Sequence, residues 1–453
     1  MTDPAELSLS ADAIRDDFVP KEGFLSPEFH RLEKERLWPK VWQIACREEE
    51  LKKVGDFVVY DIADDSILIV RSAPGELKAF YNVCQHRGRI LMDQKAGRSK
   101  FLFCKYHGWR WGLDGTLQKI QDEQDWDGCP TFSKQDLRLK EVKHDVWGGW
   151  VFITMDPDAE PLREFLSPVP EFLDCLELDT WRYRWYKSVV LPCNWKTALE
   201  GFNEAYHVAA THPQILENQG DDFTVARTFG RHGMYYYPEN RRPPGSPASR
   251  LGRPVPDDIR PGFVAFYDQM DKTLAAMFTP RAIRASRRLL DEVPETADHA
   301  TVLTEFARLH KEEAERDGAG LPEVSYEQYV AIGQNWHVFP NHVFLPLIDG
   351  SIAYRARPWG DDPNQCIFDA WSLERVPPGE EREVEREFYP DWTVETKERF
   401  GLVLSQDFHN FGQVQKGMKC RGFAGSRTNP VQELEIPNMH RALYNYVFGP
   451  DGD

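Results

Sequence analysis

The sequence predicts an α+β protein in which a small all-β domain precedes a larger domain of helices and an antiparallel sheet. From Trp42 to about Thr154 the chain consists of short β-rich runs separated by turn signals, as in small antiparallel sandwiches. Residues 155–161 then have the Asp- and Pro-rich composition of a linker. Beyond this linker, helical and strand-like segments are mixed, so most of the chain forms a second domain.

The first elements can be placed from their local signals. A helical stretch at about residues 26–36 has Ser26 as its N-cap and Pro27 at its first helical position. The β-rich runs that follow cover residues 57–60, 66–70, 77–81 and 147–153. We therefore assign residues 1–40 to an N-terminal helical segment that packs on the larger domain, residues 41–160 to the β domain, and residues 161–453 to the larger domain.

Within the larger domain, hydrophobic periodicity predicts the remaining elements. Helices are expected at residues 195–211, 263–290, 297–316, 393–411 and 439–447, and strands at 336–347, 351–357 and 366–376. The Pro-, Arg- and Gly-rich stretch at 238–261 is predicted to be a loop that is too long and polar to lie in the core. Apolar residues at 263–278 and 339–347 could line a cavity or could equally be ordinary core.

Composition excludes several kinds of partner. The 453 residues carry a net charge of −18 without a clear basic cluster, so we expect no nucleic-acid partner. Residues 1–6 lack the features of a secretory signal, and no apolar run reaches the length of a membrane span. Eight irregularly spaced cysteines argue against a disulfide scaffold and for a reducing compartment. The prediction is a cytoplasmic protein with no membrane partner.

Two short cysteine–histidine pairs carry the strongest chemical signal. Cys84-Gln85-His86 and Cys104-Lys105-Tyr106-His107 are separated by 17 residues, and a glycine follows each pair closely. Two thiolates and two imidazoles can hold a 2Fe-2S cluster, with the imidazoles raising its reduction potential. A tetrahedral zinc site could use the same four atoms, although zinc fingers usually pair Cys with Cys and His with His. A disulfide between Cys84 and Cys104 is the third alternative.

A second set of polar residues lies in the predicted helix at 195–211. Glu200, Asn203, Glu204 and His207 follow one another at i, i+3, i+4 and i+7, as on the wet face of an amphipathic helix. His212 comes five residues after His207 and directly before a proline, so a helix that ends between them could bring both imidazoles together. Two histidines and one carboxylate form the facial triad of non-haem iron(II). With 73 acidic residues in the chain, spacing does not choose the carboxylate.

Over almost its whole length the chain resembles the large, catalytic subunit of Rieske-type aromatic-ring-hydroxylating oxygenases. The resemblance rests on the Cys-x-His and Cys-x-x-His-Gly-Trp loops, on residues 145–152, on 194–212, and on Gln406-Asp407-Phe408-His409-Asn410. It implies an N-terminal Rieske domain and a helix-grip (START/Bet v 1-like) catalytic domain.

In such proteins Cys84 and Cys104 would bind one iron of the cluster and His86 and His107 the other. The resemblance further implies that His207, His212 and Asp407 hold a mononuclear Fe(II). Without it, Asp407 would be read as a surface aspartate near a helix end.

Three positions depart from the family pattern. Lys105 stands where proline is usual, which we expect to affect partner docking, and Gly201 stands where asparagine is frequent. Glu204 replaces the usual aspartate that links the two metal centres. By resemblance, Glu204 contacts His207 in its own subunit and the partner subunit's His107. A few relatives that oxidise quaternary-ammonium compounds also carry glutamate here.

The resemblance implies a complete electron route. Electrons from NAD(P)H would pass through a ferredoxin or flavin reductase to the cluster, cross a subunit boundary through Glu204, and reach the iron that uses O2. Such a crossing implies a ring, most simply a homotrimer, with or without a small β subunit. The expected substrate is organic, and aromatic or bulky and hydrophobic, as in aromatic hydrocarbon catabolism.

Three alternatives stay open from the sequence. The first is a monooxygenase or demethylase acting on a quaternary-ammonium or other small substrate, since mono- and dioxygenation do not differ in metal ligands. The second is a Rieske electron carrier, which would need little beyond the first third of the chain. The third is a ligand-binding protein without oxygenase activity.

Overall fold

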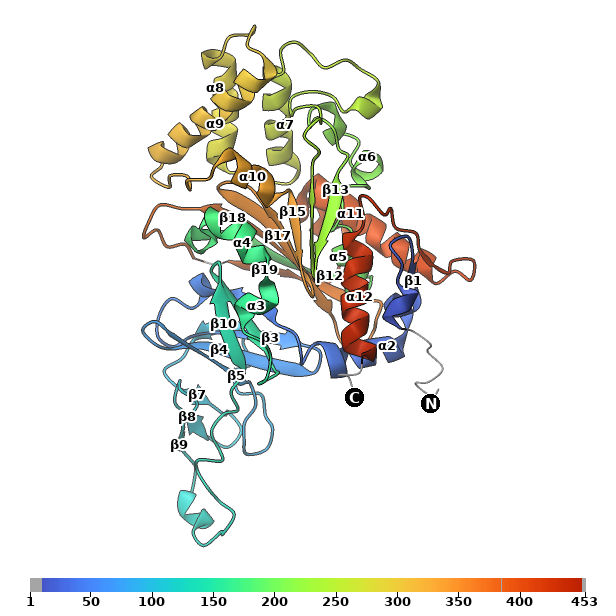
Figure 1. Ribbon diagram of the computed structural model, residues 1–453. Coiled ribbons are helices and arrows are strands. Elements are labelled where there is room, and N and C mark those ends of the chain that lie inside the picture. Colours follow the sequence, from blue (N-terminus) through green and yellow to red (C-terminus); the bar gives the residue numbers. More distant parts are fainter. Residues whose placement is uncertain (1–9, 384, 450–453) are drawn as a thin grey trace. The chain divides into compact units, whose positions relative to one another are not determined.

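A computed structural model describes residues 10–383 and 385–449, and it divides the chain into two compact units. The smaller unit, Glu33–Phe165, is mostly β. The larger unit joins the described residues up to Leu32 to the chain from Leu166 onward. The N-terminal helices α1 (Glu22–Leu25) and α2 (Pro27–Leu32) therefore belong to the larger unit (Figure 1).

The smaller unit contains three small antiparallel sheets, with strand orders β5-β4-β3-β6, β7-β8-β9 and β10-β11-β2. The strands are β2 Gln43–Arg47, β3 Asp56–Ile62, β4 Asp65–Ala73, β5 Glu76–Tyr81, β6 Ala96–Arg98, β7 Leu102–Phe103, β8 Arg110–Trp111, β9 Leu117–Lys119, β10 Lys143–Trp147 and β11 Trp150–Thr154. Three of the four β-rich runs expected from the sequence fall on single strands, whereas 147–153 spans the turn between β10 and β11. The two cysteine–histidine loops lie between β5 and β6 and between β7 and β8.

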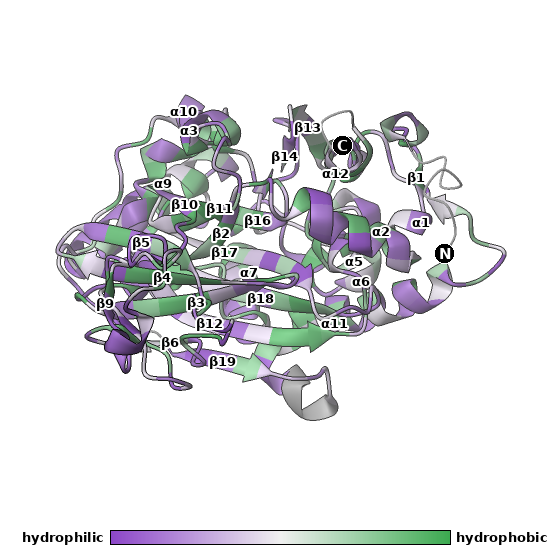
Figure 2. Ribbon diagram, turned by 90° about the horizontal axis from the view of Figure 1, so that it is seen from below, coloured by the Kyte–Doolittle hydropathy of each residue, from purple (hydrophilic) through white to green (hydrophobic). Residues whose placement is uncertain are grey.

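The larger unit is built on one eight-stranded sheet in the order β13-β14-β15-β16-β17-β18-β12-β19. Every pairing is antiparallel except the edge pair of β12 with β19. The strands are β12 Trp181–Leu191, β13 Val225–Phe229, β14 His232–Tyr236, β15 Asn335–Val338, β16 His342–Pro346, β17 Gly350–Pro358, β18 Cys366–Arg375 and β19 Arg386–Tyr389; a separate pair joins β1 Val19–Pro20 to β20 Gly425–Ser426. Figure 2 shows hydrophobic stretches along the strands and mainly hydrophilic connecting loops.

Helices of the larger unit lie against this sheet and at one end of it (Figure 1). They are α3 Leu162–Leu166, which begins in the smaller unit, α4 Val169–Leu173, α5 Trp195–Glu200, α6 Val208–Thr211, α7 Arg260–Thr273, α8 Pro280–Glu292, α9 His299–Arg316, α10 Tyr326–Ile332, α11 Val394–Met418 and α12 Glu435–Phe448. Helix α5 contacts β17, β18 and α11, whereas α12 contacts β13 and β14. No helix in the described part of the chain is long and apolar enough to span a membrane.

Four expectations about single elements were wrong. The helix expected at 195–211 ends at Glu200 and resumes only as the one-turn α6. The segment 263–290 is two helices, because Ala275 has a positive φ of 54° and Thr279 caps a new helix that starts at Pro280. Residues 336–347 form a hairpin rather than one strand, with Pro340 in its turn. Within the loop at 238–261, Gly245, Ser246, Pro247 and Ala248 are buried.

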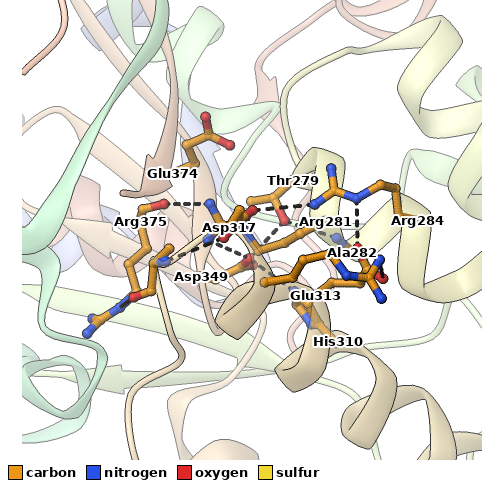
Figure 3. A network of polar contacts seen from close by, with 12 residues as sticks. Thr279, Arg281, Ala282, Arg284, His310, Glu313, Asp317, Asp349, Glu374 and Arg375 are labelled. Atoms are coloured by element: carbon orange, nitrogen blue, oxygen red, sulfur yellow. Dashed lines mark hydrogen bonds and ion pairs between the residues drawn. The ribbon is translucent and has the colours of Figure 1, made fainter. Parts of the chain in front are cut away.

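A buried ionic network fixes the helical end of the larger unit (Figure 3). The Asp349 carboxylate, just before β17, accepts from the Thr279 hydroxyl at 2.8 Å and contacts His310 Nε2 at 3.0 Å. Arg281 Nη1 donates to the same oxygen at 3.4 Å. Burial alone would raise the pKa of Asp349, but His310, Arg281 and Thr279 outweigh it and lower the pKa. This carboxylate therefore stays charged and ties α8 and α9 to the sheet.

The eight cysteines occupy very different environments, and all are free thiols. Cys193 and Cys366 are buried together with their Sγ atoms 3.9 Å apart. Cys129 in the smaller unit and Cys420 in the larger unit are exposed.

Candidate metal centres

The two cysteine–histidine loops have the same backbone turn. In the first, the Gly88 NH donates to the Cys84 carbonyl at 3.0 Å, and the Cys84 NH donates to the Arg89 carbonyl at 2.8 Å. In the second, Gly108 and Trp109 make the equivalent bonds with Cys104, at 3.0 and 2.9 Å. Gly88 and Gly108 both have φ of +73°, a left-handed conformation that side chains disfavour. The glycines explain how Cys-x-His and Cys-x-x-His can form matching loops.

The two cysteines of these loops are buried in one hydrophobic cluster, and the two histidines are half-buried. Cys84 and Cys104 are 3% and 1% exposed, and burial first, then the neighbouring Cys104 thiol, raises the pKa of Cys84. The His86 and His107 rings are 4.6 Å apart between centroids, and Trp109 stacks on His86 at 4.7 Å. Burial, His107 and Arg87 lower the pKa of His86, which favours the neutral imidazole that ligation needs.

The Nδ1 atoms of His86 and His107 are buried, and within the described residues neither has a hydrogen-bond partner. Buried polar atoms without partners are uncommon and need an explanation. Two thiols and two unpaired imidazole nitrogens are the donor set of a 2Fe-2S cluster with mixed ligands, so these residues fit that cofactor.

The second site begins at the N-terminus of α5. The Asn194 side chain accepts from the Lys196 NH at 3.0 Å and donates to the carbonyls of Phe24 and Pro363, so the start of the helix is fixed. Helix α5 ends at Glu200. Its C-cap is Gly201, where a Cβ would come within 2.4 Å of the Phe411 ring. This close approach explains why the chain has glycine at a position where the resembling family often has asparagine.

The chain after α5 presents two histidines. His207 is the N-cap of the one-turn α6 and His212 is its C-cap, so both lie at the ends of a short turn rather than on one helix face. Their rings are 5.2 Å apart between centroids and nearly perpendicular, at 75°. His212 is buried, whereas the His207 side chain is 26% exposed.

Asp407 comes from α11, about 200 residues further along the chain, and completes the group. Its Oδ1 lies 2.9 Å from His212 Nε2 and 3.6 Å from His207 Nε2. One ligand atom from each of the three residues, a ring nitrogen or a carboxylate oxygen, lies within 4.8 Å of the other two. Asp407 is 3% exposed, so the reading of it as a surface residue is wrong. The donor set of two imidazole Nε2 atoms and one buried carboxylate fits a non-haem Fe(II).

The Nδ1 atoms of His207 and His212 each have a hydrogen-bond acceptor of their own. Glu204 Oε1 lies 2.6 Å from His207 Nδ1, while Glu204 Oε2 accepts from the His207 backbone NH at 2.9 Å. Gln406 Oε1 lies 3.0 Å from His212 Nδ1. With both Nδ1 atoms bonded to acceptors, both Nε2 atoms can give lone pairs to a metal ion that Asp407 also binds.

The surroundings of His207 strongly raise its pKa. Burial lowers the pKa of His207, but the charge of Glu204, its hydrogen bond and the charge of Asp407 outweigh burial and raise the pKa to about 9. Metal uptake at neutral pH therefore has to displace a proton from this imidazole.

Comparison with known proteins finds two matching family profiles in this chain. The sequence profile "Ring hydroxylating alpha subunit (catalytic domain)" matches residues 178–448, and the profile "Rieske [2Fe-2S] domain" matches residues 41–133. The chain belongs to the ring-hydroxylating alpha-subunit family. The fold class and the two metal cofactors expected from the sequence, one 2Fe-2S cluster and one mononuclear iron, are thereby confirmed. Members of this family use O2 and electrons derived from a reductase.

Curated relatives of this alpha subunit act on different substrates. Glycine betaine monooxygenase oxygenase subunit of Pseudomonas aeruginosa is 27% identical over 46% of this chain and 48% of its own length. Anthranilate 1,2-dioxygenase large subunit of Acinetobacter baylyi is 31% identical over 43% of this chain and 44% of its own length. The matched region thus spans about half the length of these relatives.

Solved structures share the fold of this alpha subunit over nearly its full length. A quaternary ammonium Rieske monooxygenase in complex with L-carnitine has a TM-score of 0.64 at 18% identity and covers 97% of this chain and 99% of its own. Naphthalene 1,2-dioxygenase with indole bound in the active site has a TM-score of 0.63 at 18% identity, covering 97% and 93%.

The apolar residues at 263–278 could have been cavity lining or core, and Phe263, Tyr267 and Phe278 are core in this alpha subunit. Phe263, Tyr267, Phe278 and Phe306 stack on one another, with Tyr267 and Phe278 at 4.0 Å. A pocket of about 270 Å³ lies instead beside the iron-ligand candidates, lined by Thr211, Ser405, Gln406, His409 and Asn410. No sequence pattern predicts the hydrogen bond between Gln406 and His212, because an amide next to a ligand has no distinctive spacing.

Proposed function

We propose that this chain is the catalytic subunit of a Rieske oxygenase that hydroxylates a small organic substrate. The observation that carries the proposal is the convergence of His207, His212 and Asp407 in a chain that also holds four buried cluster donors. When bound, the cluster supplies single electrons, and the mononuclear iron supplies the activation of O2. An electron carrier would not need the second donor set, and a ligand-binding protein would need neither.

The proposed ligands are Cys84, His86, Cys104 and His107 for the cluster within a Rieske domain at 41–160. In the catalytic domain at 161–453, His207, His212 and Asp407 are the proposed iron ligands. Each side chain has a distinct task. Asp407 places one negative charge between the two Nε2 atoms and so favours a divalent cation there.

Glu204 holds the proton of His207 on Nδ1, which fixes the tautomer and makes Nε2 a better donor. We further propose that Glu204 accepts a hydrogen bond from the partner subunit's His107 in a homotrimer. Both Glu204 oxygens already bond to His207, but each carboxylate oxygen has two acceptor positions, so a third bond is available. A ferredoxin or flavin reductase, supplied by NAD(P)H, would reduce the cluster, and a small β subunit is compatible with the proposal.

Replacing Glu204 by alanine tests the bridging role. We expect Glu204→Ala, supplied with saturating Fe(II) to offset weaker ligation by His207, to retain both metals and a cluster that bleaches on reduction, but to lose at least about 90% of substrate turnover, since loss of an outer hydrogen-bond partner costs about 10–100-fold. Metal content, visible absorbance and product formation are measured together. Glu217→Ala, which removes an exposed carboxylate from the same region, should behave as wild type. Wild-type turnover in Glu204→Ala would refute the bridge.

Two substrate classes have support. Aromatic or bulky hydrophobic substrates are suggested by the family profile and by relatives such as anthranilate 1,2-dioxygenase. Quaternary-ammonium substrates are suggested by Glu204, and the first relatives named above act on glycine betaine. Incorporation of oxygen-18 from O2 into a panel of aromatic, steroid-like and quaternary-ammonium compounds separates the classes. One labelled atom per product would indicate a monooxygenase and two a dioxygenase.

A further inference from the structure

The two histidines of the iron site are supported in chemically different ways. His207 is backed by a carboxylate, Glu204, and His212 is backed by an amide, Gln406. His212 is only 2% exposed, so water is a poor substitute for the acceptor at its Nδ1. Without an acceptor, a buried imidazole NH would lose its hydrogen bond, and the proton could move to Nε2, the atom that faces Asp407.

A second amide fixes the orientation of the first. Gln214 Nε2 donates to the same Gln406 Oε1 at 2.8 Å, so the oxygen rather than the NH2 group of Gln406 is turned toward His212. The backbone carbonyl of Gln214 in turn accepts from Gln269 Nε2 on α7 at 3.0 Å. Gln269 thus holds the backbone of Gln214, whose side chain holds the Gln406 amide beside His212.

The choice of an amide has an electrostatic consequence. Glu204 and Asp407 together supply two negative charges around the proposed Fe(II), which balances its charge. A carboxylate at position 406, which is half-buried, would orient His212 equally well but would add a third negative charge beside the buried His212 and Asp407.

We propose that Gln406 is the positioning residue for His212, with Gln214 fixing its amide. Gln406 holds the Nδ1 proton so that Nε2 is free to bind iron, and it does so without adding charge. This inference rests on the proposed function, because it takes His212 as an iron ligand. The amide-backed histidine is the neutral counterpart of the carboxylate-backed His207.

Iron binding to the full-length, cluster-loaded protein tests the proposal without measuring turnover. The mononuclear iron is removed with a chelator, and Fe(II) is titrated back in competition with a chromogenic chelator under anaerobic conditions. Gln406→Leu, which removes the acceptor, should raise the Fe(II) dissociation constant by about 10- to 100-fold. Gln406→Glu restores an acceptor and should bind Fe(II) at least as tightly as wild type, with a lower midpoint potential for the mononuclear iron.

Two further variants keep the test decisive. Gln214→Met leaves α11 untouched and should weaken Fe(II) binding in the same direction but less than Gln406→Leu. Gln413→Glu, an exposed charge change two turns further along α11, should leave both affinity and potential unchanged.

If Gln406→Leu does not fold, the outcome rests on Gln214→Met and Gln406→Glu. Wild-type Fe(II) affinity in Gln406→Leu, or in Gln214→Met, would overturn the proposal. Equal weakening in Gln406→Leu and Gln406→Glu would also overturn it. Failure of wild-type protein to bind more Fe(II) than Asp407→Ala would instead overturn the proposed function itself.

Discussion

The two candidate metal sites of this chain are prepared for their ions in opposite ways. In the cluster site, His86 and His107 bury Nδ1 atoms for which the described residues offer no partner. In the iron site, the Nδ1 atoms of His207 and His212 are bonded to Glu204 and Gln406, and only the Nε2 atoms converge. The first site needs its cofactor to satisfy buried atoms, whereas the second is ordered by the protein itself.

This difference predicts that the stability of the folded chain depends on the cluster more than on the mononuclear iron. An unsatisfied buried polar atom costs about 1–3 kcal/mol, so two of them weaken the smaller unit unless the cluster is bound. The iron site has no comparable penalty, and its ion should come and go with little effect on folding. The cluster is therefore expected to be a structural component, and the mononuclear iron an exchangeable one.

The largest effect is expected from removing a cluster ligand. Cys104→Ala should abolish acid-labile sulfide and the visible absorbance of the protein, and lower the melting temperature of the smaller unit, because the buried histidine nitrogens lose their partner. Sulfide analysis and thermal unfolding measure this. Cys129→Ala, which removes an exposed cysteine of the same unit, is the control. If Cys104→Ala kept labile sulfide, the ligand assignment would be wrong.

Removing an iron ligand should affect only one metal. In Asp407→Ala we expect the iron-to-sulfide ratio to fall from about 3:2 to about 1:1, with an unchanged cluster spectrum, since the cluster donors lie in the other unit. Glu398→Ala, which removes an exposed carboxylate from the same helix, should keep the full ratio. If Asp407→Ala lowered the melting temperature as far as Cys104→Ala, the mononuclear iron would be a structural component rather than an exchangeable one.

The smallest effect is expected at His337, where an unpaired buried nitrogen should make stability depend on pH. His337 in β15 also has a buried Nδ1 without a partner among the described residues, and it belongs to neither candidate metal site. Burial, and then the nearby His232, lower the pKa of His337 from 6.5 to about 3. In the unfolded chain this histidine binds a proton below pH 6.5, whereas in the folded chain it does so only near pH 3.

Its contribution to stability is therefore fully present above pH 6.5 and is lost as the pH falls toward 3, at up to about 1.4 kcal/mol per pH unit. His337→Gln should flatten the free energy of unfolding in this window, measured by denaturant titration at several pH values. His409→Gln should not change the slope. An unchanged slope in His337→Gln would show that the buried imidazole is already charged.

The contrast also explains what the sequence could and could not predict. The cluster loops are local, so Cys84, His86, Cys104 and His107 could be proposed as one set of ligands from spacing and glycine positions, although spacing left a zinc site and a disulfide open. The iron site combines segments about 200 residues apart, and only resemblance to a family pointed to Asp407. The ideal-helix spacing predicted one continuous helix, but α5 ends before Gly201. At Gly201 the Phe411 ring leaves no room for a side chain. Gln406 was missed because its role depends on where its amide oxygen points, which no sequence pattern contains.

The exposed cysteines allow the protein to be labelled at defined positions. Cys129 and Cys420 are exposed, one on each unit, whereas burial raises the pKa of Cys175 and keeps Cys193 and Cys366 away from reagents. A thiol-reactive spin label should therefore attach to one native position per unit without engineered cysteines. Pulsed dipolar spectroscopy on the doubly labelled chain would then measure how the two units are arranged in solution.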